Sequence, residues 1–207
     1  MVRFPICLFL PLLALSAQAS GATLVVSQLS SDETPASLLT ATLDFQIIGA
    51  NELTLRVRND TATPDAYLLS EIFFNASVDV TSLTLVSATS SADGLVSDEW
   101  KLASGHAGGF GRFDFQLLNA KGNSKNEIAP GESVDFVFTI GGIGPFDPSD
   151  FTSELSTIPP GEFPSLAAVK FVSGSGDDSA YGAMVPEPLT ILQLGMGLAG
   201  LSWLRRR

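Results

Sequence analysis

Leu53-Thr54-Leu55-Arg56-Val57-Arg58 alternates apolar and polar side chains residue by residue. Successive side chains of a β-strand point to opposite faces of a sheet, so this period places one face in a core and the other in water. Residues 113–118 repeat the period, because three apolar side chains alternate there with Asp114 and Gln116. One dry face and one wet face are typical of antiparallel sheets. Both segments therefore predict half-buried antiparallel strands.

Six further segments are short and rich in β-branched and aromatic residues, which favours strands. They are Leu24–Val26, Thr42–Ile48, Leu68–Asn75, Val78–Val86, Val134–Ile140 and Leu166–Val172. Turn-forming residues lie at Gly49–Asn51, Ala92–Gly94, Lys121–Ser124 and Ala129–Glu132. No long amphipathic helix pattern fits between residues 20 and 184. We therefore expect an all-β fold, an antiparallel two-sheet β-sandwich of jelly-roll or immunoglobulin/cohesin-like shape.

A long connection rich in proline and glycine, Gly141–Pro164, separates the last two of these segments. Long loops within a domain are usually packed by their own side chains. We expect Phe146, Phe151 and Phe163 to fold back onto the sandwich.

The first residues are typical of a secretory signal peptide. Arg3 precedes an apolar run over residues 4–15, and the small residues Ala17 and Ala19 stand where a signal peptidase reads the chain. We expect cleavage after Ala19, and a second small-residue site lies three residues later. Cys7, the single cysteine, leaves with the peptide. The exported part therefore has neither disulfides nor thiol chemistry.

The other end of the chain combines three elements in a fixed order. Val185-Pro186-Glu187-Pro188 comes first, an apolar run of about 16 residues follows from Leu189 to Leu204, and Arg205-Arg206-Arg207 comes last. An α-helix needs roughly 17–25 residues to cross a bilayer core, and Trp203 with the arginines extends the run into the interface. The arginines stay cytoplasmic under the positive-inside rule, which places the preceding domain on the far side of the membrane.

This combination resembles the C-terminal sorting signal of PEP-CTERM proteins of Gram-negative bacteria. In that family an integral-membrane cysteine peptidase, the exosortase, is thought to recognise the Pro-Glu-Pro segment and remove the tail. The resemblance implies that Pro186, Glu187 and Pro188 are the recognition motif. It also implies that residues 189–204 are a transient membrane helix and that residues 205–207 are the stop signal. This resemblance covers only the two ends of the chain.

Residues 108–115 and 174–183 are also similar to stretches of ectodomains that precede this signal. Two other kinds of tail share parts of the pattern. A GPI signal normally ends apolar and needs no arginine triplet. A plain C-terminal membrane anchor needs no particular residues outside its span, so the Pro-Glu-Pro segment favours processing over a retained tail.

We divide the chain into a signal peptide (residues 1–19), one β-sandwich ectodomain (20–184) and the sorting signal (185–207). About 165 residues is a normal size for one domain with its own core. Without the two signals, 21 acidic and 7 basic residues remain, which gives a net charge near −14. Such a surface repels nucleic acid and anionic membranes and attracts cations.

Residue types that carry catalysis are scarce in this sequence. His106 is the only histidine, it has no partner at catalytic or metal-binding spacing, and its glycine-rich neighbourhood lacks a phosphate-binding pattern. Asp60-Thr61-Ala62 is similar to the core of aspartic proteases, but it lacks the apolar flanks that bury such a site. We therefore expect a protein that is not an enzyme.

Asp147, Asp150, Asp177 and Asp178 are the candidate metal ligands. Carboxylates in loops suit Ca²⁺, which prefers oxygen ligands. Neither pair has EF-hand spacing, and acidic loop residues are usually only solvated. We expect no cofactor, with a structural Ca²⁺ at these two pairs as the alternative.

Together these patterns favour an exported, non-enzymatic β-sandwich with a structural or adhesive role at the cell surface or in the extracellular matrix. Its processing partners would be signal peptidase and exosortase, and the C-terminal helix would hold it transiently in the inner membrane. Association with exopolysaccharide in a biofilm is implied by the resemblance alone. The alternative is a carbohydrate-binding module that uses Trp100 and Tyr181 as stacking platforms, or a glycan-active enzyme that uses Asp98 or Glu99.

Overall fold

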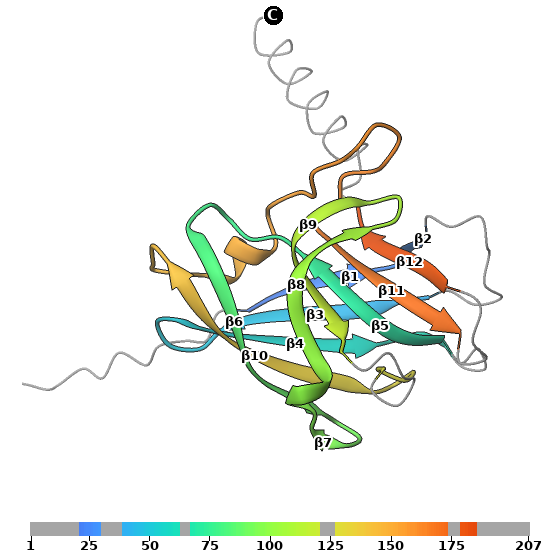
Figure 1. Ribbon diagram of the computed structural model, residues 1–207, viewed down its shortest axis with the longest axis horizontal. Coiled ribbons are helices and arrows are strands. Elements are labelled where there is room, and N and C mark those ends of the chain that lie inside the picture. Colours follow the sequence, from blue (N-terminus) through green and yellow to red (C-terminus); the bar gives the residue numbers. More distant parts are fainter. Residues whose placement is uncertain (1–20, 30–38, 63–66, 121–126, 174–178, 186–207) are drawn as a thin grey trace, which may run out of the picture.

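A computed structural model of the chain describes residues 21–29, 39–62, 67–120, 127–173 and 179–185. These residues form two six-stranded sheets in which neighbouring strands are antiparallel (Figure 1). Sheet A contains, in spatial order, β1 (Gly21–Val26), β3 (Ala41–Ile47), β4 (Glu52–Asn59), β10 (Ser133–Gly142), β6 (Val80–Ser90) and β7 (Gly94–Leu95). Sheet B contains β2 (Gln28–Leu29), β12 (Ser179–Met184), β11 (Ala167–Ser173), β5 (Tyr67–Phe74), β9 (Gly111–Asn119) and β8 (Trp100–Ala107). Two short 3-10 helices, η1 (Ser97–Glu99) and η3 (Pro148–Phe151), join strands of these sheets.

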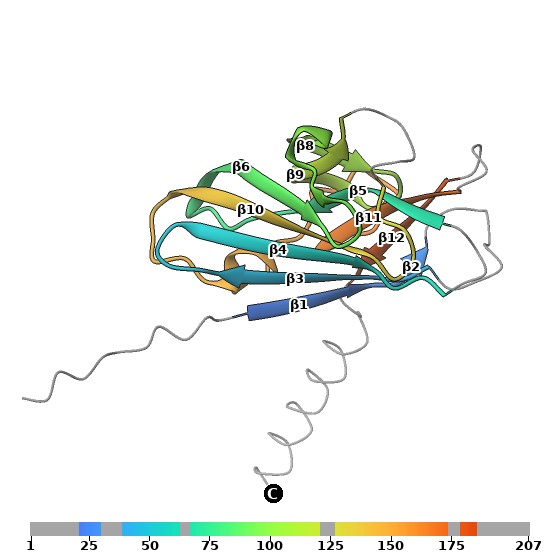
Figure 2. The ribbon, with the colours of Figure 1, turned by 90° about the horizontal axis from the view of Figure 1, so that it is seen from below.

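The expected all-β fold of two packed antiparallel sheets is confirmed. Each of the eight predicted segments overlaps a strand, and Figure 2 shows β1, β3, β4, β10 and β6 side by side in that order. Four strands, β2, β7, β8 and β12, were not predicted. The expected signal peptide, the turn at 121–124 and the C-terminal helix lie outside the described residues.

The predicted alternation in β4 is present in the structure. Leu53, Leu55 and Val57 are fully buried, whereas the residues between them are exposed or half-buried. On one side Leu55 pairs with Phe136 of β10, and on the other with Phe45 of β3, and both partners are fully buried. Aligned apolar side chains on three neighbouring strands therefore make one wall of the core.

Aromatic rings fill the space between the two sheets. The ring of Phe45, from sheet A, lies 5.6 Å from that of Phe74, from sheet B, in an edge-on arrangement. It also stacks on Phe151 of η3, with ring centroids 6.1 Å apart. Such aromatic contacts add to the free energy gained by burying the rings. The core is therefore closed by both sheets and by the helix in the long connection.

The connection between β10 and β11 folds back onto the sandwich at two of its three phenylalanines. Phe146 and Phe151 are buried, as expected, but Phe163 is 55% exposed, so that prediction was wrong. Asp147 and Asp150 hold η3 in place through a capping box. Phe163 follows the turn at Pro159–Glu162, which carries it away from the sandwich core.

Asn59, at the end of β4, links the two sheets from a fully buried position. Its Nδ2 donates hydrogen bonds to the carbonyl oxygens of Tyr67 in β5, at 2.9 Å, and of Ile128, at 2.8 Å. Its Oδ1 accepts a hydrogen bond from the backbone N–H of Thr61 at 3.1 Å. A buried amide satisfied in this way fixes where the chain leaves sheet A for sheet B.

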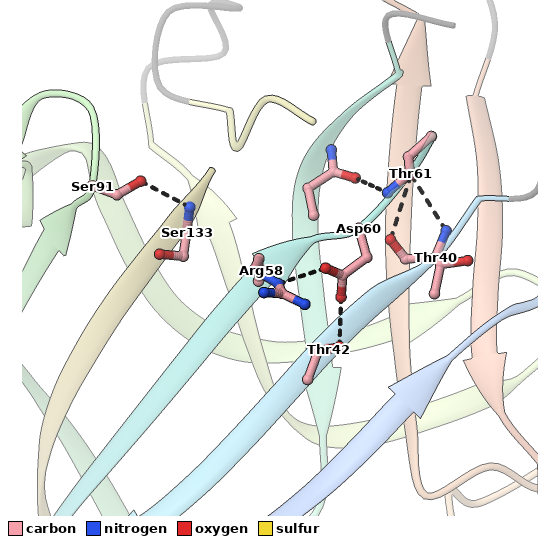
Figure 3. Close-up of polar contacts among 8 residues, drawn as sticks. Thr40, Thr42, Arg58, Asp60, Thr61, Ser91 and Ser133 are labelled. Atoms are coloured by element: carbon pink, nitrogen blue, oxygen red, sulfur yellow. Dashed lines mark hydrogen bonds and ion pairs between the residues drawn. The ribbon is translucent and has the colours of Figure 1, made fainter. Parts of the chain in front are cut away.

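Asp60, the next residue, ties the ends of β3 and β4 together. Its Oδ2 accepts a hydrogen bond from Thr42 Oγ1 and its Oδ1 lies against Arg58 Nε, each at 2.5 Å (Figure 3). Both contacts are structural, and they account for the carboxylate of the Asp60-Thr61-Ala62 segment without catalysis.

A second apolar layer covers part of the outer face of sheet B. We call it the outer cluster, and its buried members are Phe73, Ala107, Phe110, Phe113, Ala168 and Ala183, with Tyr181 and Val185 packed against them. The tip of the β8–β9 hairpin supplies the ring of Phe110, which is fully buried. Sheet B is therefore buried on both faces in this region.

Residues 156–165, which we call the strap, run alongside this hairpin tip. Ser156 Oγ donates a hydrogen bond to the carbonyl oxygen of Phe110 at 2.5 Å and accepts one from the N–H of Ser165 at 3.0 Å. Thr157 and Arg112 exchange backbone hydrogen bonds of 3.0 and 2.8 Å. The strap is thus fastened at both of its ends.

Candidate functional site

One hollow among the described residues is a groove where β6 of sheet A faces β8 and β9 of sheet B. Its volume is about 500 Å³. Its lining includes Ser77, Val78, Thr81, Ser104, Phe113 and Asp114. Hydroxyl groups, a carboxylate and an aromatic ring therefore line one open channel between the two sheets.

A smaller hollow of about 230 Å³ adjoins the groove and shares Ser104 and Phe113 with it. Gly105, His106 and Arg112 complete its lining. Gly105 lies at an irregularity in the β8–β9 pairing, where a Cβ atom would fall 2.2 Å from Gln116 Oε1. Only glycine fits there without displacing Gln116, so the backbone itself shapes this part of the groove.

The polar side chains of the groove are held by hydrogen bonds. Asp114 Oδ2 accepts a hydrogen bond from the N–H of Ala76 at 3.4 Å, and Ser77 Oγ donates to Asp150 Oδ1 at 2.8 Å. His106 Nε2 lies 3.0 Å from Glu162 Oε1 of the strap. The groove therefore offers preset donors and acceptors, and its histidine is engaged with a carboxylate.

A second polar group lies on the outer face of sheet B. Lys170 and Glu71 face each other directly on β11 and β5, with Nζ and Oε1 3.0 Å apart. Gln116 Nε2 donates to Glu71 Oε2 at 2.5 Å. Burial opposes the charged form of Lys170, but the hydrogen bond and charge of Glu71 outweigh it and raise the lysine pKa. Lys170 is therefore a stably charged partner of Glu71, which does not suit a nucleophile.

Tyr181, one of the two predicted stacking platforms, lies beside this pair. Its ring packs 6.2 Å from that of Phe73, and a Cβ atom on Gly108 would come within 3.3 Å of it. Burial raises the pKa of its hydroxyl. The ring is thus partly covered by the hairpin tip.

Trp100 is not a stacking platform, which corrects the prediction. It begins β8 and is only 3% exposed, with its ring set edge-on against Phe136 at 5.0 Å. A sugar stacks on an exposed ring face, and this face lies in the core. The neighbouring Asp98 and Glu99 belong to η1, and none of the three residues of this helix is buried.

The carboxylates of Asp147 and Asp150 serve η3 in the described structure. Asp147 Oδ1 accepts a 2.7 Å hydrogen bond from Ser149 N, and Asp150 Oδ2 accepts a 2.9 Å bond from Asp147 N. The bonds from Ser149 hold the pKa of Asp147 below its ordinary value. Asp177 and Asp178 lie outside the described residues. Among the residues that are described, no group of three or more His, Cys, Asp or Glu side chains is placed to hold a metal ion.

Of the predicted sorting residues the structure describes Val185 alone. Val185 packs against the outer cluster, directly after β12. Pro186, Glu187, Pro188 and Arg205 to Arg207 lie outside the described residues, as do Ala17 and Ala19. In the part of the chain that is described, no helix is long and apolar enough to cross a membrane.

Sequence reasoning did not find the groove. Its walls come from β6, β8 and β9, and β8 was not predicted as a strand. The one available signal was the pairing of His106 with a glycine-rich turn, which marks the hairpin tip but not the groove beside it.

Comparison with known proteins gave no match: no family model, no curated protein and no solved structure matches this chain.

Proposed function

We propose that this chain is an exported, non-enzymatic structural module of the cell surface or extracellular matrix, released from the membrane by cleavage at its Pro-Glu-Pro segment. In this proposal residues 1–19 direct export and residues 189–204 hold the chain in the inner membrane until an exosortase acts. The fold supports a passive role outside the cell, because it is stabilised by two packed sheets and needs no disulfide.

The observation that carries the proposal is the position of β12, the last described strand, directly before the Pro-Glu-Pro segment. β12 is paired with β11 on one side and with β2 on the other, and Val185 packs on the outer cluster. Pro186 follows without a spacer. Proline has no N–H to continue a strand ladder, so the motif begins where the pairing of β12 stops. A membrane-embedded peptidase would therefore meet its motif between the domain and the span.

The intact mass of the mature protein, recovered from membrane and extracellular fractions of a native producer, tests this proposal. We expect an extracellular form that begins near residue 20 and ends within residues 186–188. A form that runs to Arg207 and occurs only in membranes would contradict it and identify a plain C-terminal anchor.

A pair of variants assigns the cleavage to the motif. Glu187→Ala should leave the protein in the membrane fraction at its unprocessed mass. Glu154→Ala, which removes the same charge from an exposed position of the ectodomain, should be processed normally. Equal processing of both variants would show that cleavage does not depend on the Pro-Glu-Pro segment.

The groove favours a second candidate function, the retention of a polysaccharide chain. It is open to solvent and is lined by the Ser77, Thr81 and Ser104 hydroxyls, the Asp114 carboxylate and the half-buried ring of Phe115. Hydroxyl and carboxylate groups beside an aromatic surface suit the hydrogen-bonding and apolar faces of a sugar. In this reading the module would hold a matrix glycan without cleaving it.

Two threonines of β6 test the groove. Thr81 lines it and Thr84 does not, and both are exposed on the same strand. Thr81→Arg should abolish retention of the mature protein on matrix polysaccharide, whereas Thr84→Arg should bind like the unmodified protein. Equal binding by both variants would remove the groove from this role, and hydrolysis of the polysaccharide would favour a glycosidase instead.

A further inference from the structure

The strap carries exposed apolar side chains at its outer edge. Ile158 is 43% exposed and Phe163 is 55% exposed, and Pro159 and Pro160 between them are exposed as well. Ile158 and Phe163 flank one turn within a six-residue segment. Two exposed apolar side chains this close together are unusual on a domain with a net charge near −14. The backbone here is held to the hairpin tip, because the Phe163 N–H donates to the carbonyl oxygen of Gly109 at 2.9 Å, while these side chains stay open to water.

The only charged residue of the strap is turned back toward the domain. Glu162 lies against His106 Nε2 at 3.0 Å, and its side chain is 18% exposed. The carboxylate is therefore drawn to the hairpin beside its tip, which leaves the outer edge of the strap free of charge.

The tip of the strap is a preformed turn. The N–H of Glu162 donates to the carbonyl oxygen of Pro159 at 3.2 Å, and Gly161 between them has φ +92°. Proline at the second position and a positive φ at the third are the marks of a type II turn. Because the two prolines have no N–H, moving this tip out of water leaves few backbone donors without a partner.

The strap stands beside the last described residues of the domain, Met184 and Val185. Leu166, directly after the strap, donates its N–H to the carbonyl oxygen of Met184 at 2.9 Å. Val185 then packs on the cluster that contains Phe110, whose carbonyl oxygen is bound by Ser156 of the strap. Figure 1 shows the strap extending beyond the β8–β9 hairpin at this end of sheet B.

Only Pro186, Glu187 and Pro188 separate Val185 from the apolar run that begins at Leu189. Three residues span at most about 10 Å. The polar region on each side of a bilayer is roughly 5–7 Å thick. A domain tethered this closely holds its Val185 end, and the strap beside it, against the headgroups.

From this juxtaposition we infer that the strap is a lipid-contact surface, whose edge of Ile158, Pro159, Pro160 and Phe163 enters the boundary between headgroups and acyl chains while the tail is in the membrane. The inference rests on the proposed membrane span. It sets the orientation of the uncleaved domain, with the hairpin end of sheet B toward the bilayer and the Pro-Glu-Pro segment held at the membrane surface.

Site-specific labelling of the full chain, with only the signal peptide removed, tests the inference. That form has no cysteine, so Phe163→Cys gives a single attachment point for an environment-sensitive dye. Leu95→Cys is the matched control, because Leu95 is 74% exposed on β7, outside the strap. Each protein is reconstituted into phosphatidylcholine vesicles, with and without brominated acyl chains.

We expect several-fold stronger quenching by brominated lipid at position 163 than at position 95. Ile158→Ser, introduced into the protein labelled at 163, should weaken this quenching. Vesicles rich in phosphatidylglycerol should weaken it too, because the acidic domain is repelled by anionic lipid.

Protease protection of residues 189–204 distinguishes a failure of the lipid-contact surface from a failure of the membrane span. If residues 189–204 are protected while the labels at 163 and 95 are equally accessible to an aqueous quencher, the lipid-contact surface is wrong and the span stands. If the tail is not protected at all, the membrane span of the proposed function fails as well.

Discussion

Sheet A and sheet B differ in what covers their outer faces. On sheet A, outward side chains pair with one another near water: Arg56 donates to both oxygens of Asp135, at 2.6 and 2.8 Å, and its side chain is 58% exposed. On sheet B, Phe73 faces outward and is fully buried beneath the hairpin tip. The outer face of sheet A is solvated, whereas part of the outer face of sheet B is covered by a hydrophobic core of its own.

This difference shows how the domain is layered. The main core lies between the sheets and contains side chains from both of them. The outer cluster packs onto sheet B only, so it depends on that sheet already being formed. We therefore expect the main core to determine global stability and the outer layer to open separately, as units of lower local stability do.

The largest effect is expected from Phe45→Ala in the main core. Phe45 contacts rings from sheet B and from η3, so truncation leaves a cavity that neither sheet can close. We expect a loss of about 3–5 kcal/mol in the free energy of unfolding, measured by urea denaturation. Val25→Ala, at an exposed position, should stay within about 0.5 kcal/mol of the unmodified domain.

Phe110→Ala should have a smaller effect, because the hairpin tip covers the outer cluster from one side and can settle into the space. We expect about 2–3 kcal/mol. Amide hydrogen exchange should rise in the strap and hairpin but not in β3 and β4. Equal loss of protection in both sheets would show that the two layers form a single cooperative unit.

Ser156→Ala tests how the strap is fastened. The substitution leaves the Phe110 carbonyl and the Ser165 N–H without their partner, which should cost about 1–2 kcal/mol. Exchange should accelerate at Ser165 and Phe163. Ser82→Ala, at an exposed serine of β6 outside the strap, is the control and should change neither stability nor exchange at these two amides.

Asp147→Ala tests the cap of η3. Because Asp147 is exposed, we expect a loss of only about 0.5–1 kcal/mol at neutral pH. The pKa of Asp147 is lowered in the folded state, so its contribution is present above the ordinary value of 3.8 and is lost as the pH falls through the folded value. The stability difference between variant and unmodified domain should therefore vanish in acid. A difference that persists in acid would contradict a cap carried by the charged carboxylate.

The smallest effect is expected on the wet face of sheet A. A double-mutant cycle of Arg56→Ala and Asp135→Ala should give a coupling energy of about 0.2–1 kcal/mol, because both groups are accessible to water. Added salt should reduce it. A coupling energy as large as the Phe110→Ala effect would contradict the view that the outer face of sheet A is solvated whereas that of sheet B is partly buried.

Local sequence pattern, rather than the sheet to which a strand belongs, explains which strands were predictable. β4 of sheet A and β9 of sheet B both alternate apolar and polar side chains, and this period identifies them in the sequence. β12 is the segment Ser179-Ala-Tyr-Gly-Ala-Met184, whose residues have weak strand preference and lie between two other strands in an environment that the sequence does not reveal. β8 contains Ser104, Gly105 and His106, and it pairs through an irregular register.

The candidate site was predicted less well than the fold. Tryptophan serves equally as core and as sugar platform, and only the position of Trp100 between the sheets decides for the core. In the sequence, the acidic pair Asp147 and Asp150 is compatible with a cation site and with a helix cap. In the structure, the hydrogen bonds from Ser149 and within the pair identify it as a helix cap. The groove depends on a strand of sheet A facing a hairpin of sheet B, and no local pattern marks that contact.

The first strands of the domain cross from one sheet to the other at Ser27, because β1 belongs to sheet A and β2 to sheet B. Among the described strands β2 pairs only with β12, through Leu29 with Gly182 and Gln28 with Ala183. A chain that is exported amino end first presents β2 to the far side of the membrane early, but its partner arrives last. Under the proposed export, sheet B would close only after residues 179–184 had crossed the membrane, so completion of the fold would coincide with the arrival of the tail.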